Sequence, residues 1–180
     1  GGTNRKTAAS RLKTYIGGGI SEVDMWVLSA NFTGDALPIT SNIERADFTG
    51  FEETQMGTGM TFSSGVFTFP STGYWLVNGI MGFSLAGDTA YVNNEIDVTI
   101  NNSNYYAVVR GHSFIDQSQG ATTYTSQNSS LIVDVTNTTN VKVRFGSQAS
   151  NTSTITMGPT NETGAALNET RFIFIRLGDT

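Results

Sequence analysis

Few side chains in this chain could carry out chemistry. Glu95 and Asp97 stand two residues apart in the segment NEIDVTI, and a β-strand would place both on one face. Paired carboxylates of this kind are what glycoside hydrolysis requires, with one acting as an acid and the other as a nucleophile or base. The alternative is a solvated strand face that happens to carry two charges. We favour the solvated face and expect no catalytic residues.

The remaining reactive groups are also isolated. His112 is the single histidine, no partner motif surrounds it, and the chain has no cysteine. A thiolate metal site is therefore not available, and one histidine cannot supply both a catalytic triad and a further base. The segment from Gly158 to Glu169 offers oxygen atoms that could bind calcium, but without a fixed ligand spacing, so a plain polar loop is the alternative. We expect a protein that is not an enzyme and that holds no cofactor.

The composition favours a globular β-protein. The chain has 180 residues, of which 14% are charged, and a formal net charge of -5. An acidic chain without clustered basic residues is a poor ligand for nucleic acid phosphates. No apolar run reaches the roughly 20 residues that a membrane-spanning helix needs. We therefore expect neither nucleic acid binding nor membrane insertion.

The elements that position these residues are predicted to be strands. Apolar residues alternate with polar ones in MWVLSANFT, NEIDVTI and YYAVVRGHSFI, and turn residues separate the segments. VKVRFGSQ follows YTSQNSSLIVDV after a short turn, which predicts a hairpin. Residues 158–168 are expected to form a loop. About eight to ten such strands, without a helical pattern after residue 20, predict an all-β fold of two antiparallel sheets.

One predicted strand, over residues 74–85, is apolar on both faces. Trp75, Val77 and Met81 share one face, and Leu76 and Ile80 share the other. The last strand repeats this pattern, because Ile173 and Ile175 alternate with Phe172 and Phe174. Such a surplus of apolar residues predicts that copies of the chain pack together and cover one face.

The first residues differ from the rest in composition. Residues 1–20 hold a basic stretch and end near a triple glycine, which predicts a short arm or linker ahead of a domain over residues 21–180. We expect the arm to contact a partner protein through its basic side chains, which are Arg5, Lys6, Arg11 and Lys13. The chain begins with Gly, which indicates a processed or truncated start.

Residues 65–75, GVFTFPSTGYW, join two strands through a Pro-x-x-Gly turn. This segment resembles the F-x-x-P-x-x-G-x-Y signature of the tumour-necrosis-factor and complement-component-1q superfamily, and TRFIFIRL resembles its apolar last strand. The resemblance implies a jelly-roll sandwich that forms homotrimers. It also implies that Tyr74, Trp75, Phe172 and Phe174 lie near the subunit axis.

The segments GTGMTFSSGVFTFPSTGYWLV, SFIDQS and FIFIRLGDT resemble virion structural proteins of cyanophages and related marine tailed phages. This resemblance implies a trimeric jelly roll on the surface of the particle, as a tail-fibre head or a capsid decoration, with contacts to other virion proteins and to host surface glycans. The arm is basic and shows no collagen-like or coiled-coil stalk pattern. Attachment to a tail fibre and attachment to the capsid therefore both stay open. The alternative function is a lectin-like carbohydrate-binding module, in which exposed aromatic side chains stack on sugar rings. The candidates for stacking are Tyr91, Tyr105, Tyr106 and Tyr124.

Overall fold

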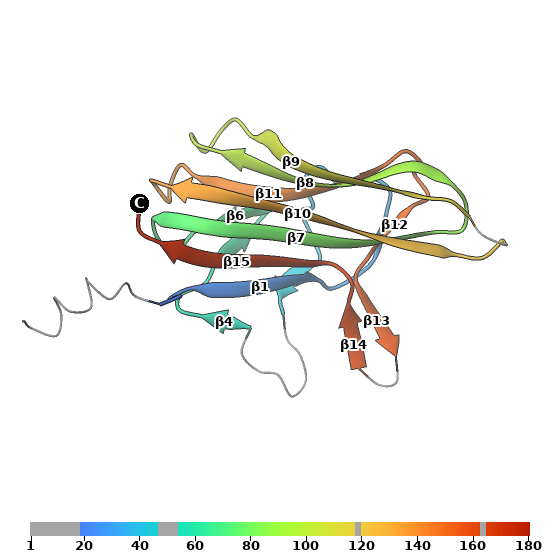
Figure 1. The fold of residues 1–180 in the computed structure, drawn as a ribbon, viewed down its shortest axis with the longest axis horizontal. Coiled ribbons are helices and arrows are strands. Elements are labelled where there is room, and N and C mark those ends of the chain that lie inside the picture. Colours follow the sequence, from blue (N-terminus) through green and yellow to red (C-terminus); the bar gives the residue numbers. More distant parts are fainter. Residues whose placement is uncertain (1–18, 47–53, 118–119, 163–164) are drawn as a thin grey trace, which may run out of the picture.

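The computed structural model describes residues 19–46, 54–117, 120–162 and 165–180. Within these ranges every regular element is a β-strand, and the main strands form two packed antiparallel sheets (Figure 1). The all-β, two-sheet architecture is therefore confirmed. The arm residues Arg5, Lys6, Arg11 and Lys13 lie outside the described residues, so the expectation for them stays a prediction.

The larger sheet has eight strands. Its longest member, β7, pairs on one side with β10 and on the other with β15 and β12. In sheet order the path runs β2 (Phe32–Thr33), β12 (Ile155–Met157), β7 (Gly73–Leu85), β15 (Arg171–Gly178), β1 (Val23–Leu28) and β3 (Ile43–Arg45), with β10 (Thr123–Val135) on β7 and β4 (Gln55–Met56) on β1.

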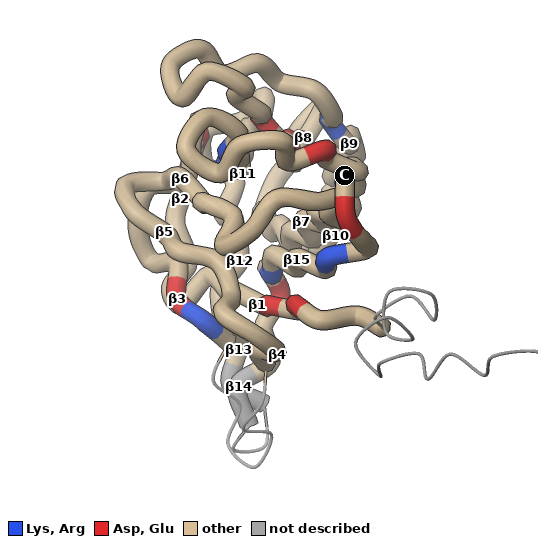
Figure 2. The backbone as a smooth tube through the Cα atoms, turned by 90° about the vertical axis from the view of Figure 1, so that its left-hand side faces the viewer, with Lys and Arg blue, Asp and Glu red and all other residues tan. Residues whose placement is uncertain are grey.

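The smaller sheet has five strands and packs behind the larger one in the view of Figure 1. Its order is β5 (Thr61–Ser63), β6 (Val66–Thr68), β11 (Lys142–Ala149), β8 (Thr89–Thr99) and β9 (Tyr106–Ile115). Figure 2 looks along the strands and shows the two layers edge-on, with few charged residues along the tube. The sheets also approach each other at one side, where Ser113 on β9 and Thr125 on β10 are hydrogen-bonded at 2.9 Å.

The space between the sheets is filled by aromatic side chains. Phe67 on β6 lies at the centre of this core, with ring centroids 5.5 Å from Trp26 and 4.9 Å from Phe174. Phe145 on β11 packs 4.4 Å from Phe172 on β15. These contacts join strands of both sheets, so the aromatic core holds the layers together.

The turn at residues 70–73 leads from the smaller sheet into β7, as the sequence predicts. Gly73 has a φ of 135°, and a Cβ there would lie 2.3 Å from the carbonyl oxygen of Gly178. Only glycine fits this position without strain. The turn is further held by Trp75, whose indole Nε1 donates to the Ser71 carbonyl at 3.2 Å, and by Arg176, which donates to the Thr72 carbonyl at 3.0 Å.

Two local predictions are wrong. β10 and β11 do not form a hairpin, because β10 pairs with β7 in the larger sheet and β11 pairs with β8 in the smaller one. The region predicted as a loop contains the hairpin of β13 (Pro159–Glu162) and β14 (Ala165–Asn168), which extends away from the sandwich (Figure 1). No helix in the described part of the chain has the length and hydrophobicity to span a membrane.

Candidate functional site

Three of the four expected interface residues lie in the hydrophobic core between the sheets. Trp75, Phe172 and Phe174 point toward the smaller sheet and are fully buried, so they are not accessible to a second copy. The expectation is wrong for these three because alternation places them on the inner face of β7 and β15. Tyr74 is the exception, since it lies on the outer face and is exposed.

The outer face of the larger sheet carries a continuous line of apolar side chains. The strand register aligns one residue from each of five strands in a row that we call the apolar row: Met56, Val23, Ile175, Leu76 and Ile132. Met56 is 50% exposed and Ile132 is 60% exposed, and the three central side chains are half-buried. No described element covers this row in Figure 1.

The rest of the outer face is nearly uncharged and mixes polar side chains with further apolar ones, among them Ile173 and Ile80. Beside the apolar row, Asn78 on β7 donates to Asn128 Oδ1 and to Ser130 Oγ on β10, each at 2.6 Å. Arg171 and Asp134 are charged residues at the margins of this area, next to Ile80 and Tyr74 in the register. A surface poor in charge and crossed by an apolar row has the composition of an interface core.

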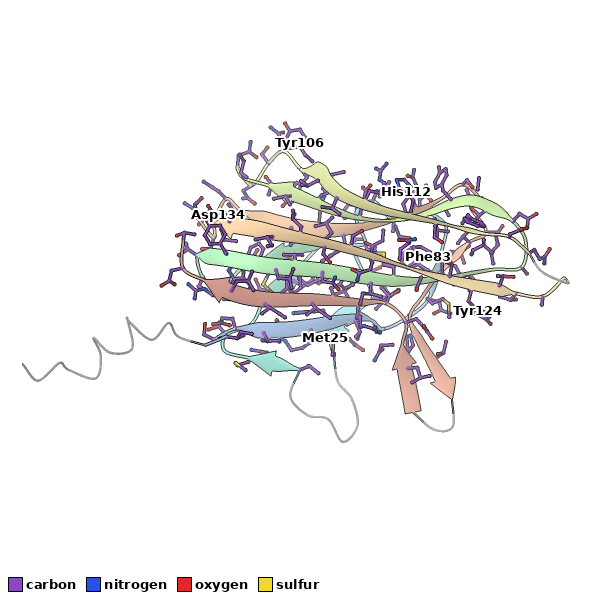
Figure 3. All side chains as sticks on the ribbon, viewed as in Figure 1. Met25, Phe83, Tyr106, His112, Tyr124 and Asp134 are labelled. Atoms are coloured by element: carbon purple, nitrogen blue, oxygen red, sulfur yellow. The ribbon has the colours of Figure 1, made fainter. Side chains whose placement is uncertain are left out.

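A hollow of about 480 Å³ opens at the other end of this face. Tyr124 and Asp134 mark the two ends of β10 in Figure 3, and the hollow lies at the Tyr124 end. Its lining comes from β7, β10, β12, β13 and the bend between β14 and β15: Gly82, Tyr124, Thr125, Ser126, Met157, Thr160 and Glu169. We call it the Tyr124 hollow. It combines an aromatic ring, hydroxyl groups and a carboxylate.

Further exposed apolar side chains lie along β9, the edge strand of the smaller sheet, with Arg110 and His112 between Val108 and Phe114. Tyr106, Val108 and Phe114 are each more than half exposed. We call these three residues the β9 patch. Figure 3 shows Tyr106 and His112 along this strand, away from the Tyr124 hollow. The chain therefore presents two different apolar surfaces, one on a sheet face and one on a sheet edge.

The acidic pair on β8 is structural. Glu95 and Asp97 do share the outer face of the strand, yet they are only 5% and 6% exposed. Glu95 accepts a 2.8 Å hydrogen bond from Arg110 Nε, and Asp97 accepts one of 2.8 Å from Arg144 Nε. Each carboxylate is thus held in an ion pair with a neighbouring strand, and the prediction of a solvated face is wrong.

The four tyrosines considered for sugar stacking do not converge. Tyr105 packs its ring 4.1 Å from the guanidinium carbon of Arg144, and burial raises its pKa, an effect that Arg144 opposes. Tyr91 and Tyr106 lie apart from the hollow. Tyr124 is the member of the four that lines the Tyr124 hollow.

Solved structures share this architecture. Murine APRIL, in crystals at pH 5.0, superimposes with a TM-score of 0.56 at 11% identity, covering 87% of this chain and 98% of that one. Eiger TNF from S. frugiperda gives a TM-score of 0.56 at 12% identity, covering 91% of this chain and 90% of that one. The fold is a tumour-necrosis-factor-like jelly roll. No family model and no curated sequence matches the chain.

Within this jelly roll, the sequence signals the apolar row but not the Tyr124 hollow. Alternation in β7 and β15 exposes a second apolar face, and the row uses Leu76 and Ile175 from that face. The hollow joins residues 82, 124–126, 157, 160 and 169, which only the sheet register brings together. No short motif marks such a site in the sequence.

Proposed function

We propose that this chain forms the body of a homotrimeric structural protein on the surface of a tailed-phage virion. The observation that carries the proposal is the apolar row on the outer face of the larger sheet, which none of the described elements covers: Met56, Val23, Ile175, Leu76 and Ile132. A continuous exposed apolar surface is characteristic of a protein interface. A second copy of the chain is the occupant that we propose.

The two apolar surfaces fit a cyclic assembly of three copies. In a cyclic trimer each contact joins two different patches, one from each subunit, because the interface is heterologous. The apolar row and the β9 patch are two such surfaces, since one lies on a sheet face and the other on the edge of the opposite sheet. We propose that the row of one copy packs against the β9 patch of the next.

The virion role rests on the sequence. The segments GTGMTFSSGVFTFPSTGYWLV, SFIDQS and FIFIRLGDT resemble phage appendage proteins, and the jelly roll is compatible with such a role. The basic residues of the arm would bind another virion protein. A tail protein as the partner would make the chain a fibre head, and a capsid protein would make it a capsid decoration. The loops of the trimer that lie farthest from the attached arm would face the host surface.

A matched pair of charge substitutions tests the assembly. Ile132→Asp places a carboxylate in the apolar row, and Ile100→Asp makes the same change at an isoleucine that is 75% exposed in a turn outside both surfaces. We expect Ile132→Asp to dissociate the assembly in sedimentation velocity, because burial of an unpaired charge is costly. Ile100→Asp should sediment as the unsubstituted protein does. Equal sedimentation of all three would contradict the proposed interface.

The virion role is tested on particles. Particles are purified from the lysate of a tailed phage whose genome encodes the chain. They are analysed by mass spectrometry and labelled with a gold-conjugated antibody against the jelly roll. We expect the chain to co-purify with intact particles and the label to decorate their surface. Recovery of the chain in the soluble fraction alone would reject the virion role while leaving the assembly result untouched.

A further inference from the structure

We infer that the Tyr124 hollow is a binding site for a neutral saccharide with vicinal hydroxyl groups. This inference goes beyond self-association, because the hollow is built within a single chain and lies about 20 Å along β7 from the apolar row, given roughly 3.3 Å per strand residue. Its lining residues come from separate parts of the sequence, and only the folded sheet assembles them.

The floor of the hollow is open because β7 carries no side chain there. Gly82 lies between Met157 on β12 and Ser126 on β10 in the register of the sheet. A Cβ at Gly82 would lie 2.9 Å from the Cβ of Glu169, which is too close for any other residue without a shift. The glycine therefore allows Glu169 to lie over the sheet and keeps the space beside it free.

One wall of the hollow supplies hydrogen-bond acceptors. Glu169 is half-buried, and its Oε1 accepts a 3.3 Å hydrogen bond from Thr160 Oγ1 on β13. A carboxylate can accept about four hydrogen bonds through its two oxygens, and the Thr160 hydroxyl uses one of them. Two adjacent hydroxyl groups of a sugar ring can each donate to such a group, and charged acceptors make strong hydrogen bonds.

The opposite wall supplies an aromatic surface. Tyr124 extends from the outer face of β10 and is 65% exposed, although it faces a concavity. A tyrosine ring offers a large, rigid apolar surface together with a polar hydroxyl. The C–H face of a sugar ring can pack on it while the ring hydroxyls turn toward Glu169 and Ser126.

The same lining disfavours other small ligands. Among the residues that the structure describes, no Lys or Arg lines the hollow, so a phosphate would meet the Glu169 carboxylate without a compensating cation. A single carboxylate is too few ligands for calcium, which takes six to eight oxygens. The mixture of hydroxyl, carboxylate and aromatic groups suits a polyol ring with one apolar face.

The test is a titration of the intact protein with glucose, galactose, mannose and N-acetylglucosamine, followed by NMR. We expect at least one sugar to bind with a Kd on the order of millimolar, as is usual for ligands of this size. Tyr124→Ala and Glu169→Gln should each weaken binding about tenfold or more. Tyr91→Ala, at a tyrosine outside the hollow, should leave it unchanged, and unaltered melting temperatures check that the variants are folded.

Three results would overturn the inference. The first is no binding of any of the four sugars, and the second is binding that survives both hollow substitutions. The third comes from repeating the titration on Ile132→Asp. If only that dissociated variant binds sugar, the hollow is covered between copies and is not a saccharide site. A failure of self-association with intact sugar binding would reject the proposed trimer and leave this inference standing.

Discussion

Leu76 on β7 and Ile175 on β15 lie directly opposite each other in the register of the larger sheet, with their side chains on its outer face. Trp75 and Phe174, one residue earlier along each strand, are fully buried against the smaller sheet. The same two strands therefore present an inner apolar face that holds the sandwich together and an outer one that is free for a second copy of the chain.

Neighbouring residues on β15 separate these two roles. Phe172→Ala should lower the free energy of unfolding by about 3–5 kcal/mol, because it leaves a cavity beside Phe145 and Phe67 in the core. Ile173→Ala, on the outer face, should cost the isolated subunit far less and mainly weaken association. Urea unfolding, measured at protein concentrations below those of assembly, compares the two. Equal losses would place Ile173 in the core as well.

The turn before β7 depends on its glycine. Gly73→Ala should destabilise the fold by about 1–3 kcal/mol, because alanine is strained at positive φ and its Cβ would meet the Gly178 carbonyl oxygen. Gly178→Ala is the matched control, since a Cβ there has no neighbour within 4 Å. Thermal unfolding of both variants measures the difference. A melting temperature for Gly73→Ala equal to that of the control would argue against this geometry.

An ion pair between the buried Asp24 and the partly exposed Arg45 joins β3 to β1, and the Asp24 carboxylate also holds the segment before β5. Asp24 is buried, and it accepts hydrogen bonds from Arg45, from Trp26 Nε1 at 2.9 Å and from the Met60 amide at 2.6 Å. Asp24→Ala should cost about 3 kcal/mol or more, because three donors lose their acceptor. Asp179→Ala removes an exposed partner of Arg176 and should change stability by less than about 1 kcal/mol. Chemical denaturation measures the loss of stability in each variant. A larger loss for Asp179→Ala than for Asp24→Ala would refute this account.

The β9 patch should contribute to assembly although it is remote from the apolar row. Phe114→Asp is expected to lower the association constant, because a heterologous interface uses both surfaces. The substitution should leave the fold intact, since Phe114 is 64% exposed in the single chain. Analytical ultracentrifugation with circular dichroism as a folding check provides the measurement. Unchanged association would mean that the row packs against some other surface.

The sequence predicts much of this fold and less of its surface. Period-two alternation identified both faces of residues 74–85, and the Pro-Gly turn fixed the start of β7. Alternation cannot say which face is inside, because that depends on the sheet that packs against it. The resemblance implies that Phe172 and Phe174 lie near the subunit axis, whereas the structure buries both and leaves Ile173 and Ile175 half-buried on the outer face.

Pairing between strands that are distant in the sequence could not be predicted for a related reason. A short turn between two strands predicts a hairpin, but the turn after β10 leads the chain to the other sheet. In this turn Asn137 Oδ1 accepts a hydrogen bond from the Thr139 amide at 2.8 Å. Glu95 and Asp97 had the pattern of a solvated face because their arginine partners are on β9 and β11. The Tyr124 hollow depends on pairings of the same kind.

The most direct test of the central claim is the native mass of the unsubstituted chain in solution, measured by native mass spectrometry at micromolar concentration. The account predicts a species with three times the mass of one chain, which Ile132→Asp converts to single chains. A single chain that stays monomeric under these conditions, with its apolar row in water, would contradict it.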